Sequence, residues 1–288
     1  MTRLAVVTTV AGRHGHLAAQ QRSLRAGSRR PDVRIVVSMG DDGVAGLLDD
    51  ADTLVRVPVP GGDLPLSLAR NEGAACALAQ GADLLVFLDV DCLAGPELLA
   101  TYEWASGQDL GTGPAVLSGP VGYLPPLEAG RTSYDAGTIA ATPAHPARPA
   151  PPPGEVTPAP DARLFWSLSF AVTAGDWTRV GGFDEGYTGY GGEDTDFGQR
   201  LTAAGGTLWW VGGATAFHQW HPVSSPPVEH LADIVTNANR FHRRWGWFPM
   251  GGWLDAFGER GLAVYEDDRW VLTGAGVRLV DGLGAVIS

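Results

Sequence analysis

Cysteines and long apolar runs are scarce in this sequence. Its 288 residues contain two cysteines, Cys76 and Cys92, which fit buried thiols better than a disulfide framework or a zinc site. No apolar run approaches the roughly 18 residues of a membrane span, and no charged and apolar leader precedes Leu4. We therefore expect a soluble, cytoplasmic protein with no integral membrane segment.

Basic residues are also in the minority. Lysine and arginine together number 20, against 32 aspartates and glutamates, which gives a net charge of −12. The one dense basic run, residues 240–244, is short. Nucleic acids and anionic membrane surfaces attract proteins with a basic patch, so neither is expected as the main partner.

A glycine-rich phosphate loop is absent as well. The sequence contains no Gly-x-x-x-x-Gly-Lys-Ser/Thr motif, and its first strand-like run, residues 4–10, is not followed by Gly-x-Gly-x-x-Gly. P-loop and dinucleotide-binding chemistry are therefore disfavoured. Any bound phosphate would be held by metal, by isolated side chains or by backbone amides.

What the sequence does contain is a buried strand that runs into two acids. Residues 84–88 are five apolar residues in a row, typical of a strand buried on both faces of a parallel sheet. Asp89 and Asp91 follow at once, where an open α/β sheet keeps its ligand crevice. Such carboxylates suit Mg²⁺ or Mn²⁺, although a buried strand can also simply end in polar residues.

The first half of the chain alternates strands with helices. Helical patterns separate the strand-like runs, which cover residues 4–10, 35–38, 53–57 and 84–88. This order predicts an α/β fold with a Rossmann-like, mostly parallel sheet flanked by helices. A composition that is 44% apolar is enough for a large core, so we expect one catalytic domain with an appended lobe.

The second half is less regular. Residues 142–160 are rich in proline and are expected to form no regular element, as either an active-site lid or a linker. Residues 164–172 alternate like a strand, and residues 176–180 indicate a short helix. Beyond residue 223, aromatic residues at helical spacing predict a helical C-terminal lobe, with a short strand pair after residue 261.

Two later motifs carry ionisable groups. A glycine pair at residues 191–192 permits a tight bend, and Glu193, Asp194 and Asp196 then fall in the first turn of a helix. Acids there complement the helix dipole, but three within four residues are more than the dipole needs. A further short strand pattern ends in two histidines, His218 and His221.

In this order the motifs resemble a family 2 glycosyltransferase of the GT-A fold. The segments that carry the likeness are ARNEG at 69–73, FLDVDC at 87–92, GGFDE at 181–185 and GGED at 191–194. The last two resemble the acceptor-side segment of β-1,4-galactosyltransferases and bacterial chondroitin-type polymerases. The Gln-x-x-Arg-Trp segment of many processive relatives is absent, so polymer extrusion is not expected.

The resemblance implies an inverting, metal-dependent transferase. It would move a sugar from a nucleotide-diphosphate donor, expected to be a UDP-sugar, to the hydroxyl of a carbohydrate or other acceptor by single displacement. The implied GT-A catalytic domain spans residues 1–222, with a C-terminal helical extension at 223–288. Within the domain, residues 1–106 form the nucleotide-sugar-binding half and residues 164–222 the acceptor and metal half.

The resemblance also implies donor-binding residues. Those bordering the nucleoside would be Thr8, Thr9, Ala11 and Arg13. Either Asp41 or Asp42 would accept hydrogen bonds from the base, and the sequence leaves open which. Those approaching the donor sugar, ribose and diphosphate would be Arg70, Asn71 and Asp89.

Metal and acceptor residues follow from the same likeness. Asp91 would ligate Mn²⁺ (or Mg²⁺) directly, His218 would close the metal site, and Asp89 would hold ribose or a metal-bound water. Asp194 is the expected catalytic base, with Glu193 as the other candidate. The acceptor would lie against Gly192, Glu193, Asp194 and, as an aromatic platform, Trp220.

Two rival functions stay open at this point. A sugar-phosphate nucleotidyltransferase would use a similar half-domain and metal, but it normally carries a glycine-rich basic loop that residues 11–16 only faintly resemble. An inactive carbohydrate-binding protein is the second rival. It would not require the acidic pair, the second acidic cluster and the histidine together.

Overall fold

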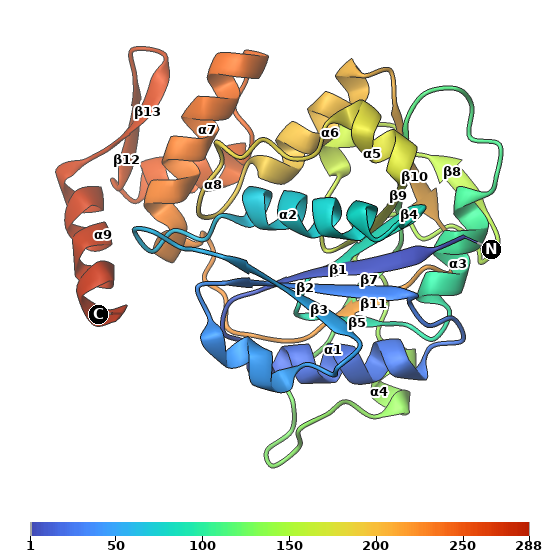
Figure 1. The fold of residues 1–288 in the computed structure, drawn as a ribbon. Coiled ribbons are helices and arrows are strands. Elements are labelled where there is room, and N and C mark those ends of the chain that lie inside the picture. The colour runs from blue at the N-terminus through green and yellow to red at the C-terminus, as the bar shows by residue number, and fades with distance from the viewer. Residues whose placement is uncertain (1, 288) are drawn as a thin grey trace.

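The computed structural model describes residues 2–287, and its centre is an eight-stranded sheet with helices on both faces (Figure 1). The strand order is β3-β2-β1-β4-β9-β6-β10-β8. All strands but β9 and β8 run in one direction. The strands are β1 (Leu4–Val10), β2 (Val33–Met39), β3 (Asp52–Val57), β4 (Leu84–Leu88), β6 (Ala115–Ser118), β8 (Val156–Pro158), β9 (Ser169–Thr173) and β10 (Thr207–Val211). The predicted α/β fold with a mostly parallel sheet is confirmed.

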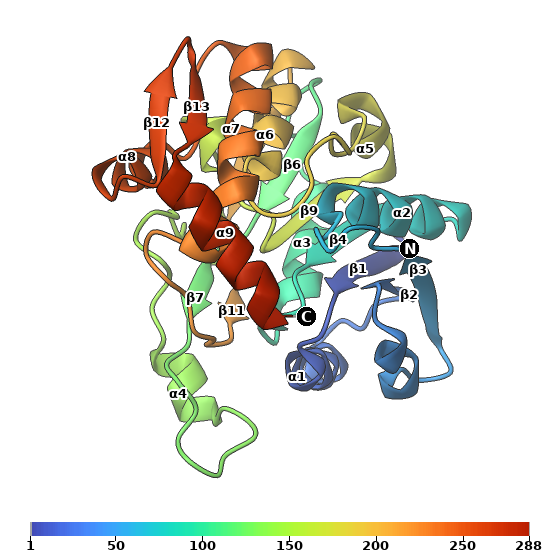
Figure 2. The same cartoon turned by 90° about the vertical axis from the view of Figure 1, so that its left-hand side faces the viewer.

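Helices cover the two faces in separate groups. One face carries α2 (Leu66–Ala79), α5 (Ala174–Val180) and α6 (Glu193–Ala203), and the other carries α1 (His14–Ala26) and α3 (Leu98–Ser106) (Figures 1 and 2). Strand β4 serves both cores: Leu85 and Phe87 pack with the α2 side, and Leu84, Val86 and Leu88 pack with the α3 side. Its continuous apolar run is explained by this two-sided burial.

The proline-rich segment is more ordered than expected. Its residues 156–158 form β8, which pairs antiparallel with β10 at the edge of the sheet. Proline is tolerated on an edge strand because one side of such a strand donates no ladder hydrogen bonds. The expectation that residues 142–160 form no regular element was therefore wrong for its last part.

The strand predicted at 164–172 begins later than expected. Ala162–Leu164 forms a short 3-10 helix, η2, capped by the Asp161 side chain, and β9 begins only at Ser169. The amide of Ser167 donates to Asp194 Oδ2 over 2.9 Å instead of joining a strand ladder. A side-chain contact made far along the chain therefore replaces the start of the strand.

A small second sheet extends the site edge. It has the order β5-β11-β7, from β5 (Cys92–Ala94), β11 (Ala216–His218) and β7 (Val121–Tyr123). In β11 the residue His218 lies opposite Cys92, the residue that follows Asp91. The pairing therefore brings the histidine motif beside the acidic pair, although 127 positions separate Asp91 from His218 in the chain.

The C-terminal lobe has its own apolar cluster, built around Leu231, Ile234, Leu254 and Phe257. Its elements are η3 (Val228–His230), α7 (Leu231–Trp245), α8 (Gly251–Glu259), β12 (Ala263–Glu266), β13 (Arg269–Leu272) and α9 (Gly274–Ile287). The predicted strand pair is the hairpin of β12 and β13. The remaining short helices of the chain are η1 (Asp42–Leu47) and α4 (Ala136–Ala141). Across residues 2–287, none of the helices combines the length and apolarity of a membrane span.

Candidate functional site

Asp91 and two histidines form a close group beyond the end of β4. Oδ2 of Asp91 lies 3.6 Å from Nε2 of His218 and 3.6 Å from Nε2 of His221. The same oxygen accepts a hydrogen bond of 2.8 Å from Nη1 of Arg13. Arg13 reaches it from a left-handed backbone conformation at φ 50°, directly before α1. Three cationic or potentially cationic side chains thus converge on one carboxylate.

The protonation of this group suits metal binding. Burial raises the pKa of Asp91, but His221, His218 and Arg13 lower it by more, so the pKa lies below its ordinary value. Burial also lowers the pKa of His218. The shifts of Asp91 and His218 favour a carboxylate and a neutral imidazole, the forms in which these two side chains bind a metal ion.

The donor set fits a divalent transition metal. One ligand atom from each of Asp91, His218 and His221 lies within 4.8 Å of the other two, close enough to surround one ion. Imidazole nitrogens favour a transition metal over Mg²⁺, which prefers oxygen ligands, and the carboxylate suits Mn²⁺. Asp89 lies outside this group, because its side chain turns toward Arg70.

Arg70 of α2 joins the donor-side acid to the acceptor-side acids. Its Nη2 donates to Oδ1 of Asp89 over 3.3 Å, and its Nη1 lies 3.6 Å from Oε1 of Glu193 and 3.9 Å from Oδ1 of Asp194. Burial lowers the pKa of Arg70, but Asp89, Asp194 and Glu193 raise it by more, so the guanidinium stays charged. One buried cation therefore holds three carboxylates together.

Two of these carboxylates have raised pKa values. Burial raises the pKa of Asp89 to about 6, although Arg70 opposes the shift. Burial, and then the charge of Asp194, raises the pKa of Glu193 to about 7, again against Arg70. Strong shifts at convergent groups are typical of functional sites.

The acceptor-side acids begin α6. Gly192 precedes the helix at φ 93°, and an added Cβ there would lie 3.2 Å from a ring carbon of Tyr187, so the position favours glycine. Glu193 is buried, whereas Asp194 is partly exposed. Oδ2 of Asp194 accepts from the Ser167 amide, while its Oδ1 has no hydrogen-bond partner among the described residues. One oxygen of Asp194 is thus anchored by a hydrogen bond, and the other is buried 3.9 Å from Nη1 of Arg70 without a hydrogen bond to any residue in 2–287.

The remaining predicted donor residues lie in or after β1, after β2 and in α2. Thr8 and Thr9 are buried in β1, where Thr8 donates to Gln20, and Ala11 follows the strand. Asp41 accepts from the Gly12 amide and pairs with His14 at 2.8 Å each, whereas Asp42 is exposed at the start of η1. Asn71 bonds the backbone of Phe183 and the Glu185 carboxylate, and so ties α2 to residues 183–185.

Four aromatic residues near these groups could serve as flat platforms for a sugar ring, and they differ in exposure. Tyr187 is buried beneath Arg240, and Trp166 packs against Arg148. Tyr190, which is 39% exposed, stacks on His230 at 4.5 Å, and Trp220 is 45% exposed. Tyr190 and Trp220 are therefore the two candidates that can meet a ligand.

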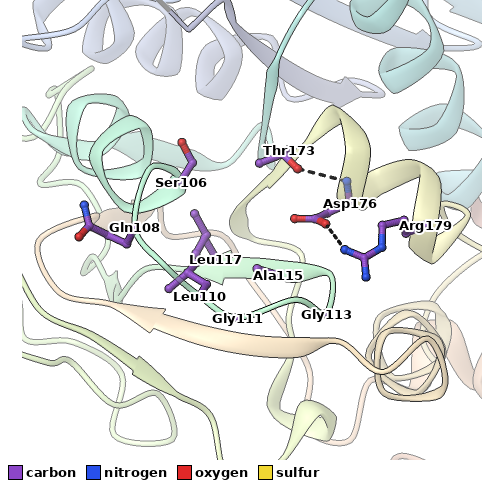
Figure 3. A pocket seen from close by; sticks show the side chains of 10 residues that line it. All are labelled: Ser106, Gln108, Leu110, Gly111, Gly113, Ala115, Leu117, Thr173, Asp176 and Arg179. Carbon is purple, nitrogen blue, oxygen red and sulfur yellow. Dashed lines mark hydrogen bonds and ion pairs between the residues drawn. The ribbon is translucent and has the colours of Figure 1, made fainter.

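A separate hollow lies away from these groups. Figure 3 shows it between α3, β6 and α5, with the ion pair of Asp176 and Arg179 at its edge. Its volume is about 140 Å³. None of the predicted site residues lines it. The hollow is therefore separate from the candidate site at the strand ends.

Sequence reasoning missed the metal-ligand geometry of His221 and the separate role of Asp196. The signal for His221 was its position three residues after His218. Asp196, although in the same acidic run, is fully buried and accepts from the Trp245 indole over 2.7 Å. It contacts the C-terminal lobe through Trp245 and Arg244.

Comparisons with known proteins agree with this fold class. The family model described as the N-terminal domain of galactosyltransferase matches residues 158–221. Two curated relatives, validoxylamine A glucosyltransferases of Streptomyces hygroscopicus subsp. jinggangensis (strain 5008) and subsp. limoneus, are each 34% identical over 215 residues. These matches cover 61% of this chain and 44% and 41% of the relatives, so the chain spans less than half of their length.

A solved structure supports the fold class. The crystal structure of GalNAc-T7 with UDP, GalNAc and Mn²⁺ resembles this chain with a TM-score of 0.51 at 14% identity. The likeness covers 84% of this chain and 50% of that protein. It agrees with the GT-A-type, mostly parallel architecture predicted from the sequence.

Proposed function

We propose that this chain is a metal-dependent, inverting glycosyltransferase. It would transfer a sugar from a nucleotide-diphosphate donor, expected to be a UDP-sugar, to a hydroxyl acceptor by single displacement. Its curated relatives are named glucosyltransferases, and its structural neighbour was solved with UDP, GalNAc and Mn²⁺. The same proposal includes membership of glycosyltransferase family 2 and the choice of UDP. It also includes the role of Asp89 and Asp91 as a DxD motif, an Asp-x-Asp pair that binds the metal and the donor.

The observation that carries the proposal is the arrangement of acids around Arg70. Asp91 forms a group with two histidines. Arg70 links Asp89, two residues before Asp91, to Asp194, which keeps one oxygen free of hydrogen bonds among residues 2–287. A displacement needs these two functions on opposite sides of the reacting carbon. Stabilisation of the leaving diphosphate is required on one side and a proton acceptor on the other.

The acceptor side supplies the proton acceptor. Asp194 takes the proton of the attacking hydroxyl on its free oxygen, while Glu193 accepts a hydrogen bond from a neighbouring hydroxyl. The acceptor oxygen bonds to the anomeric carbon, and the bond from that carbon to the diphosphate breaks with its electron pair. Gly192 lets the acceptor approach the backbone, and Tyr190 or Trp220 offers it a flat ring.

The donor side positions the nucleotide sugar. Asp91, His218 and His221 would hold Mn²⁺, which supplies Lewis-acid stabilisation of the leaving diphosphate. Arg70, Asn71 and Asp89 orient the donor sugar and ribose. The nucleoside lies along the ends of β1 and β2, against Thr8, Thr9, Ala11, Arg13 and either Asp41 or Asp42.

The proposal also assigns a role to each part of the chain. Residues 1–222 form the catalytic domain, and residues 223–288 form an extension that carries His230 and Trp253 toward Tyr190. The extension therefore shapes the acceptor end of the site.

One experiment separates this proposal from its rivals. The purified protein is incubated with Mn²⁺ and a panel of nucleotide sugars and acceptors, and the phosphate products are measured. Release of nucleoside diphosphate supports the transferase. Turnover of pyrophosphate would point to a sugar-phosphate nucleotidyltransferase, and binding of sugar without turnover to a carbohydrate-binding protein.

A further inference from the structure

Arg148 is a buried cation without a carboxylate partner. Its side chain lies in the proline-rich segment, is 2% exposed, and forms no ion pair with any residue in 2–287. Burying an unpaired charge costs free energy, and hydrogen bonds to the guanidinium must offset that cost. The acids of the site, Asp89, Glu193 and Asp194, are paired with Arg70 and not with Arg148. Arg148 therefore calls for an explanation beyond charge balance.

The contacts of Arg148 converge on the strand ends beside the site. Nη1 donates to the Ser118 hydroxyl over 3.1 Å and to the Gly119 carbonyl over 3.4 Å, and Nη2 donates to the Trp166 carbonyl over 2.6 Å. The guanidinium also lies 5.0 Å from the ring centroid of Trp166 and 5.8 Å from that of Trp210. These rings fix its plane, so the Trp166 carbonyl meets a rigid donor.

That carbonyl belongs to the peptide group that anchors Asp194. The carbonyl of Trp166 and the amide of Ser167 share one peptide bond, and the Ser167 amide donates to Oδ2 of Asp194 over 2.9 Å. A cation on the oxygen of a peptide polarises its N–H and strengthens the hydrogen bond that the N–H gives. Arg148 thus acts on Asp194 across a single peptide.

We propose that Arg148 is a positioning residue for Asp194, acting through the Trp166–Ser167 peptide. The inference rests on the proposed function, in which Asp194 accepts the acceptor proton on its other oxygen. Oδ1 of Asp194 faces Arg70 at 3.9 Å, while Oδ2 faces the peptide that Arg148 holds. Between them these groups set which oxygen of the carboxylate is presented to the acceptor.

The first test separates catalysis from binding. Arg148→Met is expected to lower kcat about 10-fold or more, on the scale of lost supporting contacts, with the KM for the donor nearly unchanged. Arg148→Lys keeps the charge and one donor and should recover part of the loss. Arg163→Met removes an exposed arginine of the neighbouring helix η2 and should leave kcat unchanged. Equal kcat in the wild type and Arg148→Met overturns the inference.

A double-mutant cycle distinguishes positioning from general support of the fold. If Arg148 acts through Asp194, adding Arg148→Lys to Asp194→Asn should cost little beyond Asp194→Asn alone. Losses that simply multiply would assign Arg148 to the fold and overturn the proposal. Arg148→Lys serves here because it is the gentler change if Arg148→Met does not fold.

A spectroscopic readout is independent of turnover. The amide proton of Ser167 is followed by NMR in the wild type, in Arg148→Lys and in Asp194→Asn. Both variants should move this resonance upfield as its hydrogen bond weakens, whereas Arg163→Met should not. An unmoved resonance in Arg148→Lys, with an active wild type, overturns this inference alone. A wild type that is silent with every donor overturns the proposed function, and with it the catalytic role of Arg148.

Discussion

Nε2 of His221 lies 3.6 Å from Oδ2 of Asp91, the same separation that joins Asp91 to Nε2 of His218. The two imidazoles come from one short segment, since His218 ends β11 and His221 follows three residues later. The carboxylate comes from the end of β4. The ends of two strands and the segment that follows β11 therefore supply three ligand atoms to one point.

Removing His221 should weaken metal binding as strongly as removing His218. Loss of a group that merely supports a metal ligand costs about 10–100-fold in affinity, so loss of a direct ligand should cost at least about 10²-fold. Calorimetric titration of Mn²⁺ with UDP into His221→Ala measures the effect. His230→Ala, a histidine of the C-terminal lobe, is the control. Equal affinity in His221→Ala and His230→Ala would remove His221 from the ligand set.

The contrast between Asp91 and Asp196 explains what the sequence could and could not predict. Asp91 follows a continuous apolar strand, so its place at a sheet edge follows from the pattern alone. Asp196 stands in the same acidic run as Glu193 and Asp194, and only the packing of α7 assigns it to Trp245. Spacing along a helix defines a face but does not identify the element that covers it.

Similar limits explain the errors in the second half of the chain. Apolar and polar residues do alternate in 164–172, but the Ser167 amide donates its hydrogen bond to Asp194 instead of to a neighbouring strand. Local sequence propensity does not reveal this distant partner. In the proline-rich segment, β8 depends on the free edge of β10, which exists only in the folded sheet. The parallel strands were predictable because their apolar runs encode burial directly.

Trp245 should stabilise the contact between α6 and the C-terminal lobe. Oδ1 of the buried Asp196 accepts a hydrogen bond of 2.7 Å from the Trp245 indole and longer ones from Tyr187 and Arg244. Trp245→Phe removes the shortest of the three and should lower the free energy of unfolding by about 1.5–3 kcal/mol, the usual contribution of a hydrogen bond to a charged group. Trp104→Phe changes a tryptophan that is 40% exposed and is the control. Urea denaturation measures both. Equal stabilities of the two variants would show that the indole N–H contributes nothing.

Glu193 should make stability depend on pH in a defined direction. Its pKa is raised from the ordinary 4.5 to about 7, because burial and Asp194 disfavour the charged form. The folded state then binds the proton more tightly than the unfolded state, so the stabilisation is complete below pH 4.5 and is lost as the pH rises through 7.

The comparison with Glu193→Gln measures this loss. Glutamine does not titrate, so the wild type should lose on the order of 3 kcal/mol relative to the variant between pH 4.5 and pH 8. Free energies of unfolding across this range give the difference. Glu128→Gln, at an exposed position, controls for the change in net charge. A difference between wild type and Glu193→Gln that is constant with pH would contradict the raised pKa.

Asp194→Asn tests the assignment of the catalytic base. The asparagine oxygen can still accept from the Ser167 amide that bonds Asp194 over 2.9 Å, so the side chain should keep its position while it loses its charge and its basicity. Turnover should fall by on the order of 10²-fold or more, the usual scale of general-base catalysis. Donor affinity should stay nearly unchanged, because in the proposal Asp194 acts on the acceptor hydroxyl and not on the nucleotide or the metal. Single-turnover rates and titration with UDP and Mn²⁺ measure the two quantities. Near-normal turnover in Asp194→Asn would move the base to Glu193, and Glu193→Gln would then have to show the loss instead.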